Sequence, residues 1–130
     1  MTQAAVAILQ KEKRILICQR KKTAPYALKW EFPGGKVEEG ESFFDCVKRE
    51  VLEELSITIN VSDRSESQIN RYDDGGVFEV MYFFVSRFEG TPVNSAFEQI
   101  RWVTLDELKS LDILEGNKPI VARMSGELFE

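Results

Sequence analysis

The 130-residue sequence contains no histidine, only two cysteines, and no apolar run long enough to cross a membrane. Without histidine, a Ser-His-Asp triad, a zinc site with imidazole ligands and an imidazole base are all excluded. Proton transfer at any catalytic site must therefore use carboxylates, Lys or Tyr. Cys18 and Cys46 form no CxxC pair, and we expect both to be buried, free thiols of a reducing compartment.

A secretory leader, in which a charged start precedes an apolar stretch, is also missing, so we expect a cytoplasmic protein without membrane association. The net charge is −5, from 17 basic and 22 acidic residues. Proteins that bind nucleic-acid polymers usually carry a basic surface, so this balance argues against such a partner. The length and the 43% hydrophobic content suit one globular domain, which we expect to span residues 1–130.

Acidic residues are concentrated in one stretch of the chain. Residues 31–54 hold eight of the 22 acids in 24 of the 130 positions. These acids are Glu31, Glu38, Glu39, Glu41, Asp45, Glu50, Glu53 and Glu54. Such a concentration of carboxylate oxygens is expected of a protein that binds a divalent cation.

The same stretch begins as a glycine-rich loop and continues as an amphipathic helix. Glu50, Glu53 and Glu54 are spaced by three and four residues, so they lie on one face of that helix. Carboxylates this close repel one another, and Mg²⁺ or Mn²⁺, which prefer oxygen ligands, relieve the repulsion. The alternative is a solvated face, but such faces usually alternate acids with Lys or Arg. A neighbouring apolar stripe should face the core and contains Phe43, Val47, Val51 and Leu55.

Eight positions in this stretch resemble the signature of the Nudix hydrolase family, G-x5-E-x7-R-E-U-x-E-E-x-G-U, in which U is a bulky aliphatic residue. The residues that match in register are Gly35, Glu41, Arg49, Glu50, Val51, Glu53, Glu54 and Ile57. The one departure is Ser56, where the family has glycine. Because this position follows a helix, where a left-handed backbone is common, a side chain there costs about 1 kcal/mol.

The resemblance extends over most of the chain to the MutT-like branch of the family, and bacterial CTP pyrophosphohydrolases look similar too. It implies an α/β fold, a Nudix-type α/β/α sandwich with a mixed central sheet. It also implies a Mg²⁺-dependent hydrolase that converts a nucleoside triphosphate to the monophosphate and pyrophosphate. The expected role is removal of oxidised purine nucleotides such as 8-oxo-dGTP. The alternatives are a CTP- or pyrimidine-directed enzyme and a non-catalytic nucleotide-sensing module; monomer and homodimer both stay open.

The resemblance further implies roles for single residues. The expected metal ligands are the backbone of Gly34 and the side chains of Glu50, Glu53, Glu54 and Glu98. Either Glu53 or Glu98 is the base that activates water, although Glu98 can equally be an idle loop carboxylate. Arg49 belongs to the catalytic set because its guanidinium can hold a carboxylate by two bonds. Glu41 either fixes the loop or favours the dipole of the helix.

The predicted substrate-binding residues are Arg20, Glu31, Phe32, Gly34, Phe78 and Asn117. Arg20 resembles a phosphate-contacting arginine, or is an exposed strand-end arginine. Asn117 resembles an asparagine that reads a purine edge, for which an amide is suited, but before Pro119 it is also an ordinary helix N-cap. Phe32 and Phe78 can stack on a base, although aromatic residues beside apolar strands usually belong to the core.

Hydrophobic alternation and turn residues predict the remaining elements. Polar residues at 10–13 and the run Asp73-Asp74-Gly75-Gly76 mark two hairpin turns. Thr104 and Glu107 resemble a capping box that starts a helix. Strands are expected at residues 4–9, 14–20, 57–61, 77–88 and 99–103, a polar segment at 63–70, and a terminal helix at 119–129.

Overall fold

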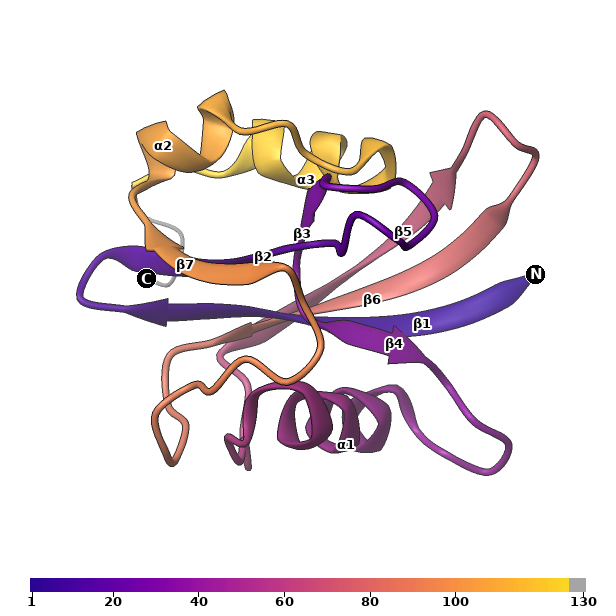
Figure 1. Ribbon diagram of the computed structural model, residues 1–130. Helices are drawn as coiled ribbons and strands as arrows, with labels where there is room; N and C mark the ends of the chain where they lie inside the picture. The colour runs from indigo at the N-terminus through magenta and orange to yellow at the C-terminus, as the bar shows by residue number, and fades with distance from the viewer. Residues whose placement is uncertain (127–130) are drawn as a thin grey trace.

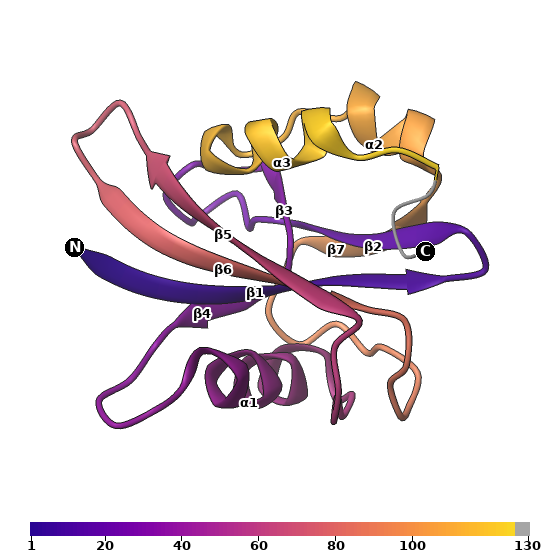
Figure 2. The same cartoon turned by 180° about the vertical axis from the view of Figure 1, so that it is seen from behind.

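A long central strand, β1 (Thr2–Lys11), organises the sheet in the computed structural model, which describes residues 1–126. Helix α1 covers one face of the sheet, and α2 and α3 cover the other (Figures 1 and 2). The other strands are β2 (Arg14–Gln19), β3 (Trp30–Glu31), β4 (Gly34–Lys36), β5 (Arg64–Arg71), β6 (Val77–Val85) and β7 (Gln99–Val103). The helices are α1 (Phe43–Leu55), α2 (Leu105–Ser110), α3 (Lys118–Arg123) and the short 3₁₀ helix η1 (Glu115–Asn117). The predicted α/β/α sandwich with a mixed sheet is confirmed.

Strand β1 has neighbours of both directions. It pairs in parallel with β6, antiparallel with β4 through Ala4–Val6, and antiparallel with β2 at its far end, where Gln10 faces Ile15. The sheet order is β3-β2-β1-β6-β5, with β4 beside β1 and β7 beside β2. The short loop that precedes α1 is therefore tied to the centre of the sheet.

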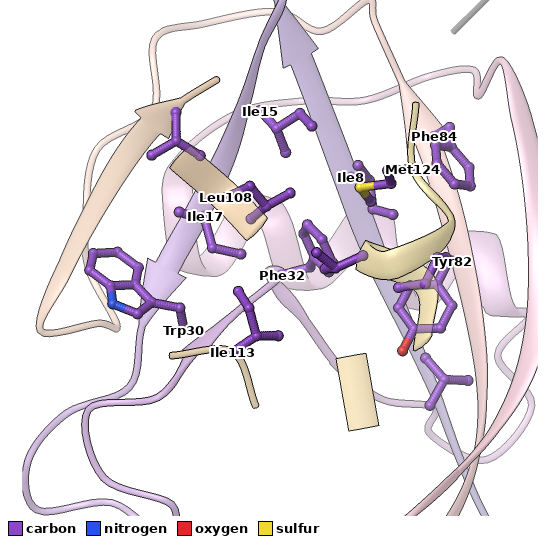
Figure 3. Close-up of a cluster of buried hydrophobic side chains, with 14 residues drawn as sticks. Ile8, Ile15, Ile17, Trp30, Phe32, Tyr82, Phe84, Leu108, Ile113 and Met124 are labelled. Carbon is purple, nitrogen blue, oxygen red and sulfur yellow. The ribbon is translucent and has the colours of Figure 1, made fainter. Parts of the chain in front are cut away.

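Two buried clusters lie on opposite faces of the sheet. Consecutive residues of β2 alternate between them: Ile15 and Ile17 point toward α2 and α3, whereas Leu16 and Cys18 point toward α1. Figure 3 shows the first cluster. Side chains therefore cover both faces of this strand, and both thiols are free and buried, as expected.

Helix α1 begins and ends as its sequence indicates. The Ser42 hydroxyl accepts the N–H of Asp45 at 3.0 Å and caps the N-terminus. Val47, Val51 and Leu55 face the sheet and are fully buried. Ser56 ends the helix in the expected left-handed conformation, with φ 58° and ψ 32°, and its N–H bonds the carbonyl of Leu52. The predicted capping box at Thr104 and Glu107 is present at the start of α2.

Three predicted elements differ from the structure. Residues 57–61 form no strand; only Thr58 makes an isolated bridge, to Glu89. The polar segment 63–70, except for Asp63, lies within β5, which pairs with β6 along its length. The terminal helix is shorter than predicted, since α3 ends at Arg123 and residues 127–130 lie outside the described part of the chain. Among residues 1–126, no helix is both long and apolar enough to span a bilayer.

Candidate functional site

At Gly34 and Gly35, the segment before α1 passes between the sheet and the helix with no room for a side chain. A Cβ on Gly34 would lie 2.1 Å from the carbonyl oxygen of Ala5. A Cβ on Gly35 would lie 2.5 Å from Cδ of Glu50. Glycine at both positions therefore lets the backbone approach β1 on one side and the acidic face of α1 on the other.

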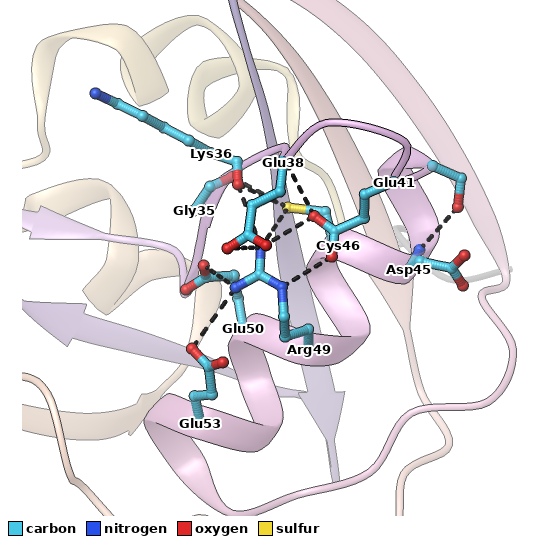
Figure 4. A network of polar contacts seen from close by, with 10 residues as sticks. Gly35, Lys36, Glu38, Glu41, Asp45, Cys46, Arg49, Glu50 and Glu53 are labelled. Atoms are coloured by element: carbon cyan, nitrogen blue, oxygen red, sulfur yellow. Dashed lines mark hydrogen bonds and ion pairs between the residues drawn. The ribbon is translucent and has the colours of Figure 1, made fainter.

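Arg49 fastens this loop to α1 (Figure 4). Its guanidinium donates two bonds to Glu41, from Nε at 2.8 Å and from Nη2 at 3.0 Å, and one to Glu50 from Nη1 at 2.7 Å. Glu41 also accepts the backbone N–H of Glu38 at 3.0 Å. The bonds from Arg49 and this N–H hold the pKa of Glu41 at about 2. Glu41 thus fixes the loop, and the expected two-bond contact of Arg49 is present.

The three glutamates on the acidic face turn to different partners. Glu50 is bonded to Arg49, and an oxygen of Glu53 lies 3.6 Å from the same guanidinium. Glu54 instead accepts the backbone N–H of Gly34 at 3.0 Å. In the described range 1–126, no three Asp, Glu, Cys or His side chains converge as a group that could hold an ion. The helix brings the predicted ligands to one face without drawing their oxygens together.

Burial and the charges of the neighbouring acids nevertheless act strongly on the pKa of Glu54. Burial, followed by the charge of Glu50, raises the pKa of Glu54 from 4.5 to about 8, against a lowering by the Gly34 N–H. The charges of Glu31 and Glu53 raise it further. A carboxyl group in this state favours neutralisation by a proton or a cation. The side-chain atoms of these glutamates that can coordinate a metal are all carboxylate oxygens, so the residues present fit a hard divalent cation.

A central cleft of about 390 Å³ opens beside this junction of loop and helix. Its volume lies within the ordinary range for small-molecule sites. Glu54 is part of its wall, which connects the cleft directly to the acidic face of α1. All six predicted substrate-binding residues line it: Arg20, Glu31, Phe32, Gly34, Phe78 and Asn117. The structure therefore brings together residues that lie up to 97 positions apart in the sequence.

The aromatic and amide residues of the cleft are not equivalent. Phe32 is 2% exposed and packs edge-on against Tyr82, so it is chiefly a core residue. Phe78 is half-buried and presents more of its ring to the cleft. Asn117 is buried and donates its Nδ2–H to the hydroxyl of Tyr82 at 2.9 Å. Asn117 occupies the N-cap position of α3, as one of the two interpretations expected, but its side chain makes no capping bond there.

Arg20 and Glu31 form an ion pair in the wall of the central cleft. Nη1 of Arg20 lies 3.0 Å from both oxygens of Glu31, and its Nε donates to the carbonyl of Pro25 at 2.7 Å. Burial raises the pKa of Glu31, and Arg20 opposes that rise. A second hollow of about 230 Å³, which Lys21 also lines, shares Arg20, Glu31 and Glu54 with the central cleft. The pair therefore lies where the two hollows meet.

Glu98 contacts the loop that follows β2. Its side chain is exposed, and Oε1 accepts the backbone N–H of Lys22 at 3.3 Å. In this conformation its carboxylate orders the loop after β2.

Sequence reasoning missed four residues of the cleft and its floor. Tyr26 and Tyr72 line the cleft, with ring centroids 5.4 Å apart, and the Tyr26 hydroxyl donates to the carboxylate of Asp74. Asn70 lines the cleft as well, and it donates to the buried Tyr82 hydroxyl at 2.8 Å. Only the turn signal at residues 73–76 pointed to this region. No local pattern relates these residues, because three separate segments of the chain supply them.

Comparison with known proteins agrees with the fold and the motif. A family model described as the NUDIX domain matches residues 1–124. The chain is 33% identical to the 8-oxo-dGTP diphosphatase of Escherichia coli K12 over 123 residues, which are 94% of this chain and 95% of the relative. It is 29% identical to the CTP pyrophosphohydrolase of the same organism over 121 residues, covering 93% and 89% of the two chains.

Solved structures also resemble this chain over most of its length. The crystal structure of a MutT NUDIX hydrolase from Burkholderia pseudomallei superposes with a TM-score of 0.81 at 26% identity, covering 95% of this chain and 98% of the other. The solution structure of the Escherichia coli ORF135 protein gives 0.77 at 28% identity, covering 94% and 86%. On the matched domain, the motif and the architecture, this chain belongs to the Nudix hydrolase family.

Proposed function

We propose that this chain is a Mg²⁺-dependent nucleoside triphosphate pyrophosphohydrolase that prefers oxidised purine deoxynucleotides such as 8-oxo-dGTP. The reaction is hydrolysis of the triphosphate to the nucleoside monophosphate and pyrophosphate. One observation carries the proposal: the central cleft and the acidic face of α1 meet at Glu54 and Gly34. A base in the cleft thus places its phosphates beside the glutamates. The 33% identity to an 8-oxo-dGTP diphosphatase supports the choice of substrate.

Nudix hydrolases generally use divalent metal cations, and the oxygen donors of this site suit Mg²⁺, with Mn²⁺ as a substitute. In the proposal, the carbonyl of Gly34 and the carboxylates of Glu50, Glu53 and Glu54 hold the cation. When bound, the cation neutralises charge on the polyphosphate and makes water more acidic. In the proposal, Glu98 becomes a further ligand when its carboxylate releases the backbone N–H of Lys22.

The remaining residues bind and position the substrate. The guanidinium of Arg20 meets the phosphates, with the basic side chain of Lys21 nearby in the second hollow. Glu53, the most exposed of the three helix glutamates at 60%, is placed to take a proton from water. Arg49 acts as a positioning residue through Glu41 and Glu50.

The base occupies the inner part of the cleft. In the proposal, the ring of Phe78 stacks against it and the amide of Asn117 meets its polar edge. Glu31 keeps Arg20 oriented through the ion pair, and Phe32 supports the floor. These roles together account for the six residues predicted to bind substrate.

The test is product analysis with Mg²⁺ and a panel of normal and oxidised nucleoside triphosphates, resolved by chromatography. Monophosphate and pyrophosphate are expected, and release of orthophosphate would overturn the proposed reaction. Glu53→Gln should reduce kcat by at least about a hundredfold, because the ligand and base candidate loses its charge. Glu39→Gln makes the same change on an exposed loop carboxylate and should leave turnover unchanged.

A CTP-directed activity is the second candidate, supported by the 29% identity to a CTP pyrophosphohydrolase. The same panel separates the two: a higher kcat/KM for CTP or dCTP than for 8-oxo-dGTP selects the pyrimidine enzyme. The phosphate chemistry is the same in both cases, so the glutamate variants do not distinguish them.

A further inference from the structure

A buried polar network lies under the central cleft, inside an otherwise apolar cluster. Asn70 and Asn117 are 2% and 5% exposed, and Tyr82 is fully buried between them. The Tyr82 oxygen accepts an amide N–H from Asn70 at 2.8 Å and another from Asn117 at 2.9 Å. Figure 3 shows the Tyr82 ring packed among aliphatic and aromatic side chains. Polar groups in such surroundings need all their partners, so the network specifies one arrangement.

The direction of the hydrogen bonds is set by groups that can act in only one way. Arg123 can only donate, and it donates to Oε1 of Gln68 at 3.2 Å. The Gly116 carbonyl can only accept, and it accepts from Nε2 of Gln68 at 3.0 Å. With its amide fixed at both ends, Gln68 donates to Oδ1 of Asn70. Asn70 must therefore turn its nitrogen toward Tyr82.

The same reasoning then applies to the amide of Asn117. The Tyr82 hydroxyl donates its one proton to the Gly116 carbonyl at 3.4 Å and accepts from both asparagines. Asn117 thus turns Nδ2 toward Tyr82, and its Oδ1 has no partner in residues 1–126. Because no buried side-chain oxygen or nitrogen in that range lacks a partner, this oxygen is open to the cleft that Asn117 lines.

We propose that Tyr82 is a specificity-determining positioning residue, which holds the Asn117 amide so that the cleft presents a hydrogen-bond acceptor. The inference rests on the proposed function, because it concerns which nucleotide that cleft selects. Bases with an N–H donor at the edge that meets Asn117 bind well, whereas bases with an acceptor there face an opposing oxygen. Tyr82 itself touches no substrate. Burial raises the pKa of its hydroxyl to about 12, so the arrangement persists at ordinary pH.

The test uses pairs of nucleoside monophosphates that differ by a donor or an acceptor on the base. The pairs are 8-oxo-dGMP with dGMP, dAMP with dIMP, and dCMP with dUMP, each titrated calorimetrically in Mg²⁺. The wild-type protein should prefer the donor member of at least one pair by about tenfold, as one neutral hydrogen bond provides. In Tyr82→Phe the amide loses its anchor, and that ratio should fall to within about twofold of unity.

Gln68→Ala is the matched control. It loosens the same network at a residue outside the cleft but leaves the Tyr82 oxygen for Asn117, so the ratio should stay near the wild-type value. A ratio of two affinities does not depend on the fraction of protein that is folded, which a purely structural defect would change. If Tyr82→Phe does not fold, Asn117→Asp supplies the test. Tyr82 can donate to one of its oxygens while the other faces the cleft, so the donor preference should persist.

Three outcomes overturn the inference: a wild-type protein that binds both members of every pair equally, an unchanged ratio in Tyr82→Phe, or a reversed preference in Asn117→Asp. Failure of the proposed function is a separate result. It appears as absent triphosphate turnover, whereas these titrations need binding alone.

Discussion

The metal-free protein should lose stability as the pH rises from about 5 to 8, and Glu54→Gln should remove that loss. The pKa of Glu54 is raised to about 8 by burial and by the Glu50 charge, whereas the unfolded chain titrates near 4.5. Because the pKa of Glu54 is higher in the folded protein than in the unfolded chain, its protonation stabilises the folded state. This stabilisation is complete below the unfolded pKa and disappears as the pH rises through the folded pKa. The shift corresponds to at most about 5 kcal/mol, or about 2–3 kcal/mol after solvent screening of a partly exposed group.

Urea unfolding, followed by fluorescence of the two tryptophans in EDTA, measures this effect. Glutamine keeps an oxygen for the Gly34 N–H but carries no charge, so Glu54→Gln should match the wild type near pH 5. At pH 8.5 it should be more stable by about 2–3 kcal/mol. Glu39→Gln, on an exposed loop carboxylate, should follow the wild-type curve throughout. Parallel pH dependences for wild type and Glu54→Gln would refute the reasoning, because Glu54 would then titrate alike in both states.

Addition of Mg²⁺ should reverse the order of stability of the wild-type protein and Glu54→Gln at high pH. A cation that binds only the ionised carboxylates stabilises the wild-type protein more as the pH rises, by about 2.7 kcal/mol at one hundred times Kd. Glu54→Gln should gain much less. Equal gains in the two proteins would place the cation away from Glu54.

Three further predictions concern the loop, the helix end and the mouth of the cleft. Arg49→Lys cannot reproduce the two-bond contact with Glu41 and should lower kcat by about tenfold or more with little change in KM; wild-type turnover would remove the positioning role. Ser56→Gly should raise the free energy of unfolding by about 0.5–1 kcal/mol, since φ is 58°, and a loss of stability in urea would contradict the strain argument. Tyr26→Phe removes the hydroxyl that bonds Asp74 across the mouth and should speed nucleotide release several-fold in stopped-flow fluorescence, whereas an unchanged rate would show that this contact does not restrain the ligand.

The acidic helix and its loop could be predicted because their signals are local. The placement of Glu50, Glu53 and Glu54 on one face requires only the geometry of one helix. The observed helix has this geometry and ends, as predicted, at Ser56 in the left-handed conformation. The orientation of the carboxylates could not be predicted in the same way. It depends on Arg49, whose guanidinium reaches Glu38 in the loop and both Glu50 and Glu53 on the helix.

Strand β5 escaped prediction for a different reason. Its sequence, Arg64–Arg71, is almost wholly polar, and only Asn70 of its residues is buried. What makes it a strand is pairing with β6, a contact that the sequence of β5 does not display. Conversely, the alternation of Ile57 and Ile59 does reflect burial, since both are fully buried, but the segment makes only one bridge. The alternation in this segment thus predicted correctly which side chains are buried, but it wrongly predicted the hydrogen bonds of a strand.

The position of β4 on the central strand also determines which parts of the site can move. Residues 34–36 are hydrogen-bonded to the middle of a strand that is itself paired on its other edge, so shifting them would require breaking the sheet. The opposite border, made of the loop with Tyr26 and the turn with Asp74, is exposed, and within the described part of the chain only side-chain contacts join the two. Adaptation to ligands of different size must therefore come from that border, while the side formed by residues 34–36 keeps its position.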